Sequence, residues 1–299
     1  MSQMKRRAND PKKHHFIPSS YLARFTDTSG FLHVFDRTSC DQWRRQQPKE
    51  VMHIRNYYRQ EWAPAGVDRN IFEKSLGEWL ESTAKNAIDC LILAPSNLTE
   101  KDFALFLVYL ELQRLRVPRQ AKMAMVLMRD TILRLAPPDI IAEIHAGKFQ
   151  LTMKKSARFD YMRMMVGQLH PWFSRMEWTV IEAEKGSAFV TTDSPLSLYN
   201  LDCPPPAEAG MALAGTRVLF PLDSRHLLVM RHPEYKKNSG CSPLKILPDP
   251  ICGDALVSVS SGKVWSRRLV TNHNRVMALL SDRLIVSASK EVLEQCIVQ

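Results

Sequence analysis

The chain lacks the motifs that mark the commonest nucleotide-binding and hydrolytic sites. It has no G-x-x-x-x-G-K-[ST] phosphate loop, no G-x-G-x-x-G dinucleotide fingerprint, no H-E-x-x-H helix and no G-x-S-x-G turn. We therefore expect no nucleotide cofactor. The same absences argue against nucleoside-triphosphate, zincin and esterase chemistry.

The sequence also lacks the features of membrane and secreted proteins. No run of about 18 uncharged apolar residues occurs, and residues 1–13 are basic with no apolar stretch behind them. The six cysteines include no C-x-x-C pair and no zinc-finger spacing with histidine, which is typical of reduced structural thiols. These absences predict a cytoplasmic protein without a membrane partner.

Positive charge is in excess. Of the 299 residues, 41 are lysine or arginine and 31 are aspartate or glutamate, which gives a formal net charge of +10. A basic balance favours a polyanionic partner, above all nucleic acid. The basic residues form only short clusters, however, such as Lys5-Arg6-Arg7 and Arg267-Arg268, and such clusters usually lie on a solvated surface.

The pattern of apolar residues predicts an α+β protein in which a central bundle of long helices packs on a mainly antiparallel sheet. We expect residues 1–13 to form a flexible basic arm. Residues 14–299 are predicted to form a single domain, helical over about 68–170 and rich in sheet over about 172–299. Pro171 is expected to end the helical part.

Three long helices are predicted, over 68–93, 99–117 and 119–135. The middle of the second, residues 103–110, is apolar all round, which is typical of a helix buried on every side. We expect an apolar stripe on the third helix to face the core. Its residues are Met123, Val126, Leu127 and Leu133.

Short runs of β-branched and aromatic residues, separated by glycine, proline and aspartate, predict strands. These runs cover 31–37, 53–58, 178–183, 188–192, 218–220, 226–230 and 283–286. The short gaps between them favour antiparallel pairing. A further helix is predicted over 269–281.

The stretch His14-His15-Phe16-Ile17-Pro18 is the first candidate for a functional site. Pro18 restricts the residue before it to an extended conformation and suits the start of a helix. Because adjacent side chains of an extended segment point to opposite faces, only one of the two imidazoles can face a given pocket. The alternative is that one histidine stabilises local structure while the other is solvated.

Gln113 and Arg116 continue the buried helix and are neighbours on its surface. A buried guanidinium needs a carboxylate or phosphate partner, since an unpaired buried charge costs several kcal/mol. The partner is either a substrate or, in a purely structural pair, a carboxylate such as Glu81 or Asp193.

Asp193 lies in Thr191-Thr192-Asp193-Ser194-Pro195, at the end of a predicted apolar strand, where polar residues are well placed for chemistry. The alternative is a turn in which the aspartate merely ends the strand. Asn272 lies near the start of a predicted helix, where amides act as caps as often as ligands.

Taken in order, these motifs resemble the uncharacterised, mainly microbial domain-of-unknown-function family 4238. The residues that carry the resemblance are His14-His15-Phe16-Ile17-Pro18 with Tyr21, Leu22 and Phe25; Gln113 with Arg116, Pro118 and Arg119; Thr192-Asp193-Ser194-Pro195; Pro221-Leu222; and Asn272. Ser194 and Ser19 depart from the asparagine and glutamine expected at those positions. The resemblance implies a site but no reaction, because no activity is assigned to that family.

Histidine, carboxylate, arginine and amide groups together are typical of sites that bind and cleave phosphodiesters. The first hypothesis is therefore a metal-dependent phosphodiesterase or nuclease that acts on nucleic acid with Mg²⁺ or Mn²⁺. Its predicted catalytic residues are His14, His15, Asp193 and Arg116. Its predicted substrate-binding residues are Gln113, Arg119 and Asn272, and its predicted metal ligands are His14, Asp193 and Glu81.

Two other classes of function stay open at this point. One is a non-catalytic regulatory protein that binds nucleic acid or another protein, in which the histidine, arginine and aspartate form a structural network. The other is a hydrolase or transferase for a small phosphorylated ligand such as a nucleotide. The residues do not indicate an oligomeric state.

Overall fold

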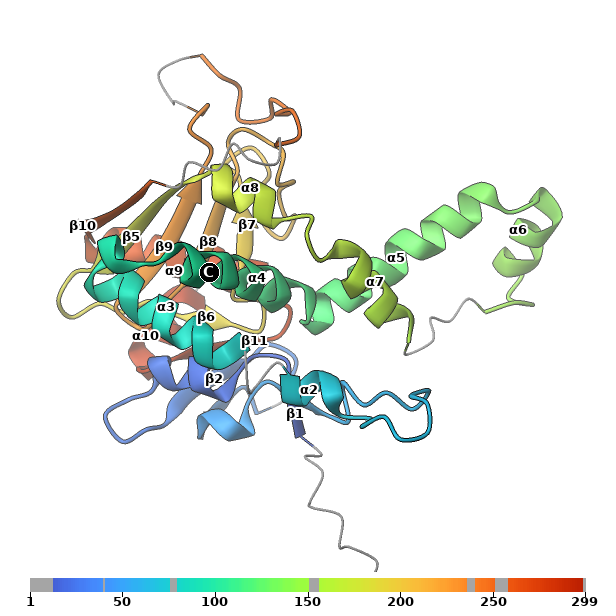
Figure 1. Ribbon diagram of the computed structural model, residues 1–299, viewed down its shortest axis with the longest axis horizontal. Coiled ribbons are helices and arrows are strands. Elements are labelled where there is room, and N and C mark those ends of the chain that lie inside the picture. The colour runs from blue at the N-terminus through green and yellow to red at the C-terminus, as the bar shows by residue number, and fades with distance from the viewer. Residues whose placement is uncertain are drawn as a thin grey trace, which may run out of the picture.

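The computed structural model describes residues 13–39, 41–75, 80–150, 156–235, 240–250 and 258–297. It is α+β, as the sequence predicts (Figure 1). The strands are β1 (Lys13–His15), β2 (Leu32–Asp36), β3 (Trp43–Gln46), β4 (His53–Arg55), β5 (Glu177–Ala183), β6 (Thr191–Thr192), β7 (Ser197–Tyr199), β8 (Arg217–Pro221), β9 (His226–Arg231), β10 (Val259–Trp265) and β11 (Leu284–Ser287).

The helices run between and after these strands. They are α1 (Ser19–Leu22), α2 (Ile71–Ser75), α3 (Ser82–Leu93), α4 (Glu100–Leu115), α5 (Pro118–Leu135), α6 (Pro138–His145), α7 (Ala157–Met165), α8 (His170–Arg175), α9 (Arg267–Leu280) and α10 (Lys290–Ile297). Short 3-10 turns cover Ala23–Phe25, Pro48–Glu50 and Pro95–Asn97.

The strands form three sheets. One has the order β10-β5-β9-β8-β7, a second has the order β3-β2-β11-β6, and β1 pairs with β4. Every described pair is antiparallel except β5 with β10, so the predicted antiparallel character is confirmed. The second sheet joins β2 and β3, from near the start of the chain, to β6 and β11, from its second half; the strand predicted over 31–37 corresponds to β2.

The five-stranded sheet buries both of its faces. On β8, Val218 and Phe220 belong to the same buried cluster as Phe106 of α4. Leu219, between them, belongs to a second cluster with Met277 of α9. Since successive strand residues point to opposite faces, α4 covers one face of this sheet and α9 the other. Figure 1 shows α4 in front of these strands.

Helix α4 follows the sequence prediction closely. Thr99 caps its N-terminus, because the Asp102 backbone N–H donates to the Thr99 Oγ1 at 3.1 Å. Its buried residues include the polar Glu111 and Gln113. The single helix predicted over 68–93 corresponds to α2 and α3, with residues 76–79 outside the described part of the chain.

The expected central bundle of long helices is not confirmed. Helices α5 and α6 extend away from the sheets (Figure 1). The stripe on α5 that was expected to face the core is largely exposed: 37% for Met123, 56% for Val126 and 55% for Leu127. Periodicity identifies an apolar face of a helix, but it does not show whether another element covers that face.

Lys13 and Pro171 also differ from expectation. Most of the predicted basic arm, residues 1–12, lies outside the described residues, and Lys13 begins β1. Pro171 lies in the first turn of α8 and so begins a helix instead of ending the helical part. No described helix is long and apolar enough to cross a membrane.

Candidate active site

Strand β1 holds the two adjacent histidines in an extended conformation. His14 pairs with Ile54 and His15 with His53 of β4. His14 is fully buried, whereas His15 is half-buried. The prediction that the two imidazoles face opposite sides is therefore confirmed, and each histidine has its own surroundings.

The hydrogen bond at His14 defines the protonation of its ring. The Tyr58 backbone N–H donates to the His14 Nδ1 at 2.8 Å, and the two rings stack with centroids 6.0 Å apart. A backbone amide can only donate, so Nδ1 accepts and Nε2 carries the proton of the neutral ring. Such a ring has no spare lone pair for a metal ion or a substrate proton. This hydrogen bond uses the Nδ1 lone pair, and the role of His14 as a base or metal ligand stays a prediction.

His15 has the same tautomer as His14, but its Nδ1 does not accept from Tyr58. Its Nε2 donates to the Lys49 carbonyl oxygen at 3.2 Å, which leaves the lone pair on Nδ1. Burial lowers the pKa of His15, with further lowering by the positive charge of Arg116, so the ring is neutral at pH 7. Of the two histidines, His15 is the one whose ring nitrogen can accept a proton.

Glu73 on α2 lies beside His15. The His15 backbone N–H donates to the Glu73 Oε1 at 3.3 Å. Burial raises the pKa of Glu73 to about 7, although this hydrogen bond and the charge of Arg116 act in the opposite direction. A carboxyl group with a pKa near neutrality can both accept and donate a proton under physiological conditions.

Arg116 follows the last turn of α4 and is 2% exposed. Its Nη1 donates to the Glu81 Oε1 at 3.1 Å, so the carboxylate partner expected at Glu81 or Asp193 is Glu81. The Tyr58 hydroxyl donates to the Arg116 carbonyl oxygen at 3.3 Å, which links Arg116 to the residue that contacts His14. The Nε and Nη2 atoms of Arg116 are buried without a hydrogen-bond partner in the described part of the chain.

Buried amide side chains without partners accompany Arg116. Both polar atoms of Gln113, one helical turn before Arg116, are unpartnered among the described residues, and so are both polar atoms of Asn70. The Gln120 Nε2 is in the same state. An unmade buried hydrogen bond costs about 1–3 kcal/mol, and proteins keep few of them. Gln113 and Arg116, one helical turn apart at the end of α4, are together typical of a site that a polar ligand completes.

Asp193 has a different set of contacts. Its Oδ1 accepts from the Asp282 backbone N–H at 3.0 Å, and its Oδ2 accepts from Arg283 and Leu284 at 2.7 and 2.8 Å. Burial raises the pKa of Asp193 to about 6, against the pull of these N–H groups. The carboxylate thus holds the start of β11, a contact that neither the catalytic prediction nor the local turn included. None of its contacts involves His14 or Arg116.

Arg119 and Asn272 lie apart from Arg116 as well. Arg119 donates to the Leu280 carbonyl oxygen and, at 3.3 Å, to that of Pro206. Asn272 lies on α9, which covers the other face of the five-stranded sheet. Of the predicted substrate-binding residues, only Gln113 lies next to Arg116.

The three predicted metal ligands are also separated. His14 contacts Tyr58, Glu81 pairs with Arg116, and Asp193 holds β11. No group of three or more His, Cys, Asp or Glu side chains arranged to hold a metal ion occurs within the described ranges. The requirement for Mg²⁺ or Mn²⁺ stays a prediction.

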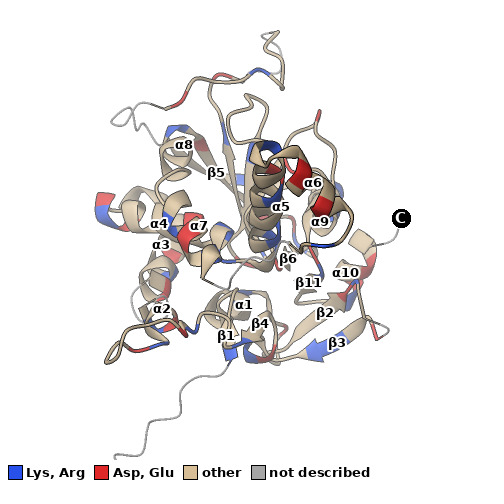
Figure 2. Cartoon of the chain, turned by 90° about the vertical axis from the view of Figure 1, so that its right-hand side faces the viewer, with Lys and Arg blue, Asp and Glu red and all other residues tan. Residues whose placement is uncertain are grey.

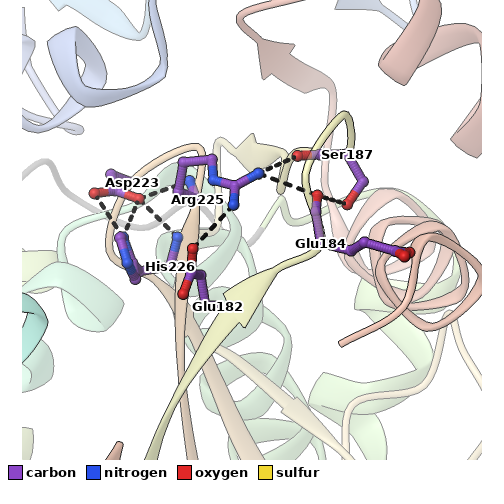
Figure 3. A network of polar contacts seen from close by, with 6 residues as sticks. All are labelled: Glu182, Glu184, Ser187, Asp223, Arg225 and His226. Atoms are coloured by element: carbon purple, nitrogen blue, oxygen red, sulfur yellow. Dashed lines mark hydrogen bonds and ion pairs between the residues drawn. The ribbon is translucent and has the colours of Figure 1, made fainter. Parts of the chain in front are cut away.

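A second histidine–aspartate pair lies in the turn between β8 and β9 (Figure 3). The His226 Nδ1 is 3.0 Å from the Asp223 Oδ1, and the same oxygen accepts the backbone N–H groups of Arg225 and His226. Arg225 then donates to the Glu182 carboxylate at 3.0 Å and to the Glu184 carbonyl oxygen at 3.1 Å. These bonds tie the turn to the end of β5, which indicates a structural role.

The charged residues are spread over the molecule. Figure 2 shows lysine and arginine on several elements, including β3, and not gathered on one face in that view. On β3 the basic residues Arg44 and Arg45 pair with Asp36 and Asp27. Basic residues that are paired and dispersed attract a polyanion less strongly than a continuous basic surface does.

Sequence reasoning missed Glu73 as a member of this site. It belongs to the short helix α2, whose orientation depends on the loop between β4 and α2, and it does not lie in a motif. Arg116 and Gln113 were found because a polar residue that continues an apolar helix requires an explanation.

Comparison with known proteins gives a family for the chain. A family model described as "Protein of unknown function (DUF4238)" matches residues 13–291. None of the curated proteins and none of the solved structures matches the chain. The match begins at β1, which carries the two histidines, and continues into α10, so it includes every element of the candidate site. The chain therefore belongs to the DUF4238 family.

Proposed function

We propose that the chain is a cytoplasmic phosphoester hydrolase that acts on a small phosphorylated ligand such as a nucleotide. The observation that carries this proposal is the buried guanidinium of Arg116, which pairs with Glu81 through Nη1 and has two further donors without partners in the described residues. A phosphate presents oxygen acceptors in the geometry that a guanidinium fork binds.

The enclosure of the site favours a small ligand over a polymer. Gln113 and Arg116 are 0% and 2% exposed. In this proposal the site takes a single phosphate group, and the backbone of a duplex stays outside it. The Gln113 amide would donate to a second phosphate oxygen, and its own carbonyl would accept from a hydroxyl of the ligand.

Glu73 and His15 supply proton transfer in this proposal. In hydrolysis a water oxygen forms a bond to phosphorus, the ester P–O bond breaks, and the leaving oxygen takes up a proton. Glu73, with a pKa of about 7, removes the proton from the attacking water. The Nδ1 lone pair of His15 is the second candidate base. Arg116 stabilises the charge that develops on the phosphoryl oxygens.

The test is release of product from p-nitrophenyl phosphate, bis-p-nitrophenyl phosphate and nucleoside monophosphates, with Mg²⁺, with Mn²⁺ and with a chelator. Glu73→Gln is expected to lower turnover about 100-fold or more. Arg116→Lys is expected to lower it to a similar degree, because lysine cannot bind two phosphate oxygens in one plane. Glu100→Gln and Arg134→Lys are matched controls on exposed side chains.

The free energy of unfolding of each variant is measured in parallel. The proposal requires that Glu73→Gln stay folded and lose turnover. It fails if the wild-type protein hydrolyses none of these esters under any metal condition, or if Glu73→Gln and Arg116→Lys both turn over like the controls. Loss of folding in both variants, without any hydrolysis by the wild type, favours the non-catalytic alternative.

A metal-dependent nuclease is the second candidate, and the net charge of +10 favours it. It predicts degradation of single-stranded or double-stranded DNA or RNA that requires Mg²⁺ or Mn²⁺ and falls steeply with added salt. A hydrolase for nucleotides would show thermal stabilisation by mononucleotides instead.

A further inference from the structure

A groove separate from the Arg116 site lies between α9 and the sheet. Its volume is about 420 Å³, which is within the range of small-molecule sites. Residues of β7, β8 and β9 form its floor, and α9 with Trp265 forms its wall. Since α9 and α4 cover opposite faces of the five-stranded sheet, this groove and the Arg116 site are on opposite sides of that sheet.

Two arginines stand side by side on the floor of the groove. Arg217 of β8 pairs directly with Arg231 of β9, and Tyr199 of β7 continues the row on the other side of Arg217. Directly paired residues of antiparallel strands point to the same face, and like charges in such a pair are destabilising. Neither guanidinium has an ion pair or hydrogen bond with any residue that the structure describes.

One neighbouring charge acts on this arginine pair. Glu177 of β5 continues the row beyond Arg231. Burial and the charge of Arg217 lower the pKa of Arg231, and Glu177 raises it. The row thus holds two positive charges, Arg217 and Arg231, and one negative charge, Glu177.

The wall of the groove carries a buried imidazole. His273 is 6% exposed, and its Nε2 has no hydrogen-bond partner among the described residues. Burial lowers the pKa of His273 to about 3, so the ring is neutral. Next to it lie the Trp265 ring, with centroids 5.9 Å apart, and the apolar side chains of Leu219 and Val229.

We propose that this groove binds an aromatic organic anion, with its phosphate or carboxylate on Arg217 and Arg231 and its ring among Trp265, Tyr199 and His273. The two arginines supply an anion site, because neither guanidinium has a partner among the described residues. The aromatic residues supply a surface for a planar ring, and the His273 Nε2 supplies one directed hydrogen bond. The inference does not rest on the proposed hydrolase activity, because the two sites share no residue.

The experiment is titration calorimetry of the full chain with three probes. Adenosine monophosphate tests an aromatic phosphate, indole-3-acetate tests an aromatic carboxylate, and adenosine tests the ring without an anionic group. Binding of either anion, at least 10-fold tighter than that of adenosine, is expected. The preferred anion distinguishes a phosphate from a carboxylate ligand.

Arg217→Gln and Arg231→Gln locate the binding. Each removes one of two charge-assisted contacts, so each is expected to weaken binding of the preferred anion about 10- to 100-fold. Arg268→Gln, on an exposed residue of α9 outside the groove, is the matched control and is expected to change the affinity less than twofold.

The melting temperature provides a second readout. Arg217→Gln removes a like-charge contact, so it is expected to keep or raise the melting temperature of the protein without ligand. The same substitution is expected to weaken binding of the anion. The proposal is overturned if neither anion binds at millimolar concentration, or if adenosine binds equally well. It is also overturned if Arg217→Gln and Arg231→Gln bind like the Arg268→Gln control.

Discussion

The pair of Arg116 and Glu81 makes a prediction about stability that depends on the unpartnered donors of the guanidinium. Replacing one member of a buried ion pair leaves the other charge uncompensated and costs about 3–5 kcal/mol. Glu81→Gln leaves the 2% exposed guanidinium without its carboxylate, so we expect a loss of about 3 kcal/mol in the free energy of unfolding.

The reverse substitution is expected to cost less. Arg116→Met leaves Glu81 unpaired, but the Glu81 side chain is 21% exposed and stays partly hydrated. The same substitution removes the two buried donors that lack partners among the described residues. Each such donor lowers the free energy of unfolding by about 1 kcal/mol or more. We therefore expect a net loss of only about 1–2 kcal/mol, since these gains offset part of the lost pair.

The double variant Glu81→Gln with Arg116→Met completes the cycle. It contains neither charge, so it is expected to be more stable than Glu81→Gln alone. Urea unfolding followed by fluorescence measures all four proteins, with Glu100→Gln as the surface control. The reasoning is refuted if Arg116→Met is the more destabilising single substitution, or if Glu81→Gln costs no more than the control.

Other features make independent predictions. Asp36 is fully buried and accepts from Arg283 at 2.6 and 2.8 Å, so Asp36→Asn is expected to cost about 3 kcal/mol in a urea titration. The side-chain hydrogen bond with Arg283 holds the pKa of Asp36 far below its usual value, so its contribution to the free energy of unfolding is full above about pH 4 and falls as the pH drops. The prediction is contradicted if the difference in free energy of unfolding between wild type and Asp36→Asn is the same at pH 5 and at pH 2. The pKa of His273 is lowered to about 3, so stability falls from pH 6.5 downward by up to about 1.4 kcal/mol per pH unit, and His273→Leu is expected to flatten that slope. Gly215→Ala is expected to lower the melting temperature by several degrees, because the added Cβ would lie 2.6 Å from the Pro243 Cβ. Gly30→Ala is expected to lower the free energy of unfolding by only about 1 kcal/mol, because an added Cβ there meets no atom within 4 Å and only the φ of +79° is unfavourable.

Much of the secondary structure follows from local pattern. The apolar run of α4, its threonine cap and the apolar strands β5, β8 and β9 are visible in the sequence, because each of these elements buries a large apolar surface. Strand β10 was not predicted. Its residues are polar and mostly exposed, since it pairs at the edge of the sheet and has no core face to impose alternation.

The candidate site was predictable only in part, for a similar reason. Burial of Arg116 follows from the helix that precedes it, and its partner Glu81 was among the two carboxylates considered. The position of Asp193 was not predictable, because its three N–H donors come from a segment about 90 residues later. The tautomer of His14 likewise depends on the backbone of Tyr58, which no side-chain motif reports.

The order of strands in the four-stranded sheet has a consequence for synthesis of the protein. β11 lies between β2 and β6, and Arg283, which precedes β11, bonds to Asp36 at a separation of 247 positions. Until residues 284–287 have left the ribosome, β2 cannot pair with β11, and its apolar face stays exposed to water. Chaperone binding to nascent chains should therefore persist until late in translation, and a stop codon before Leu284 should yield a product that proteases remove.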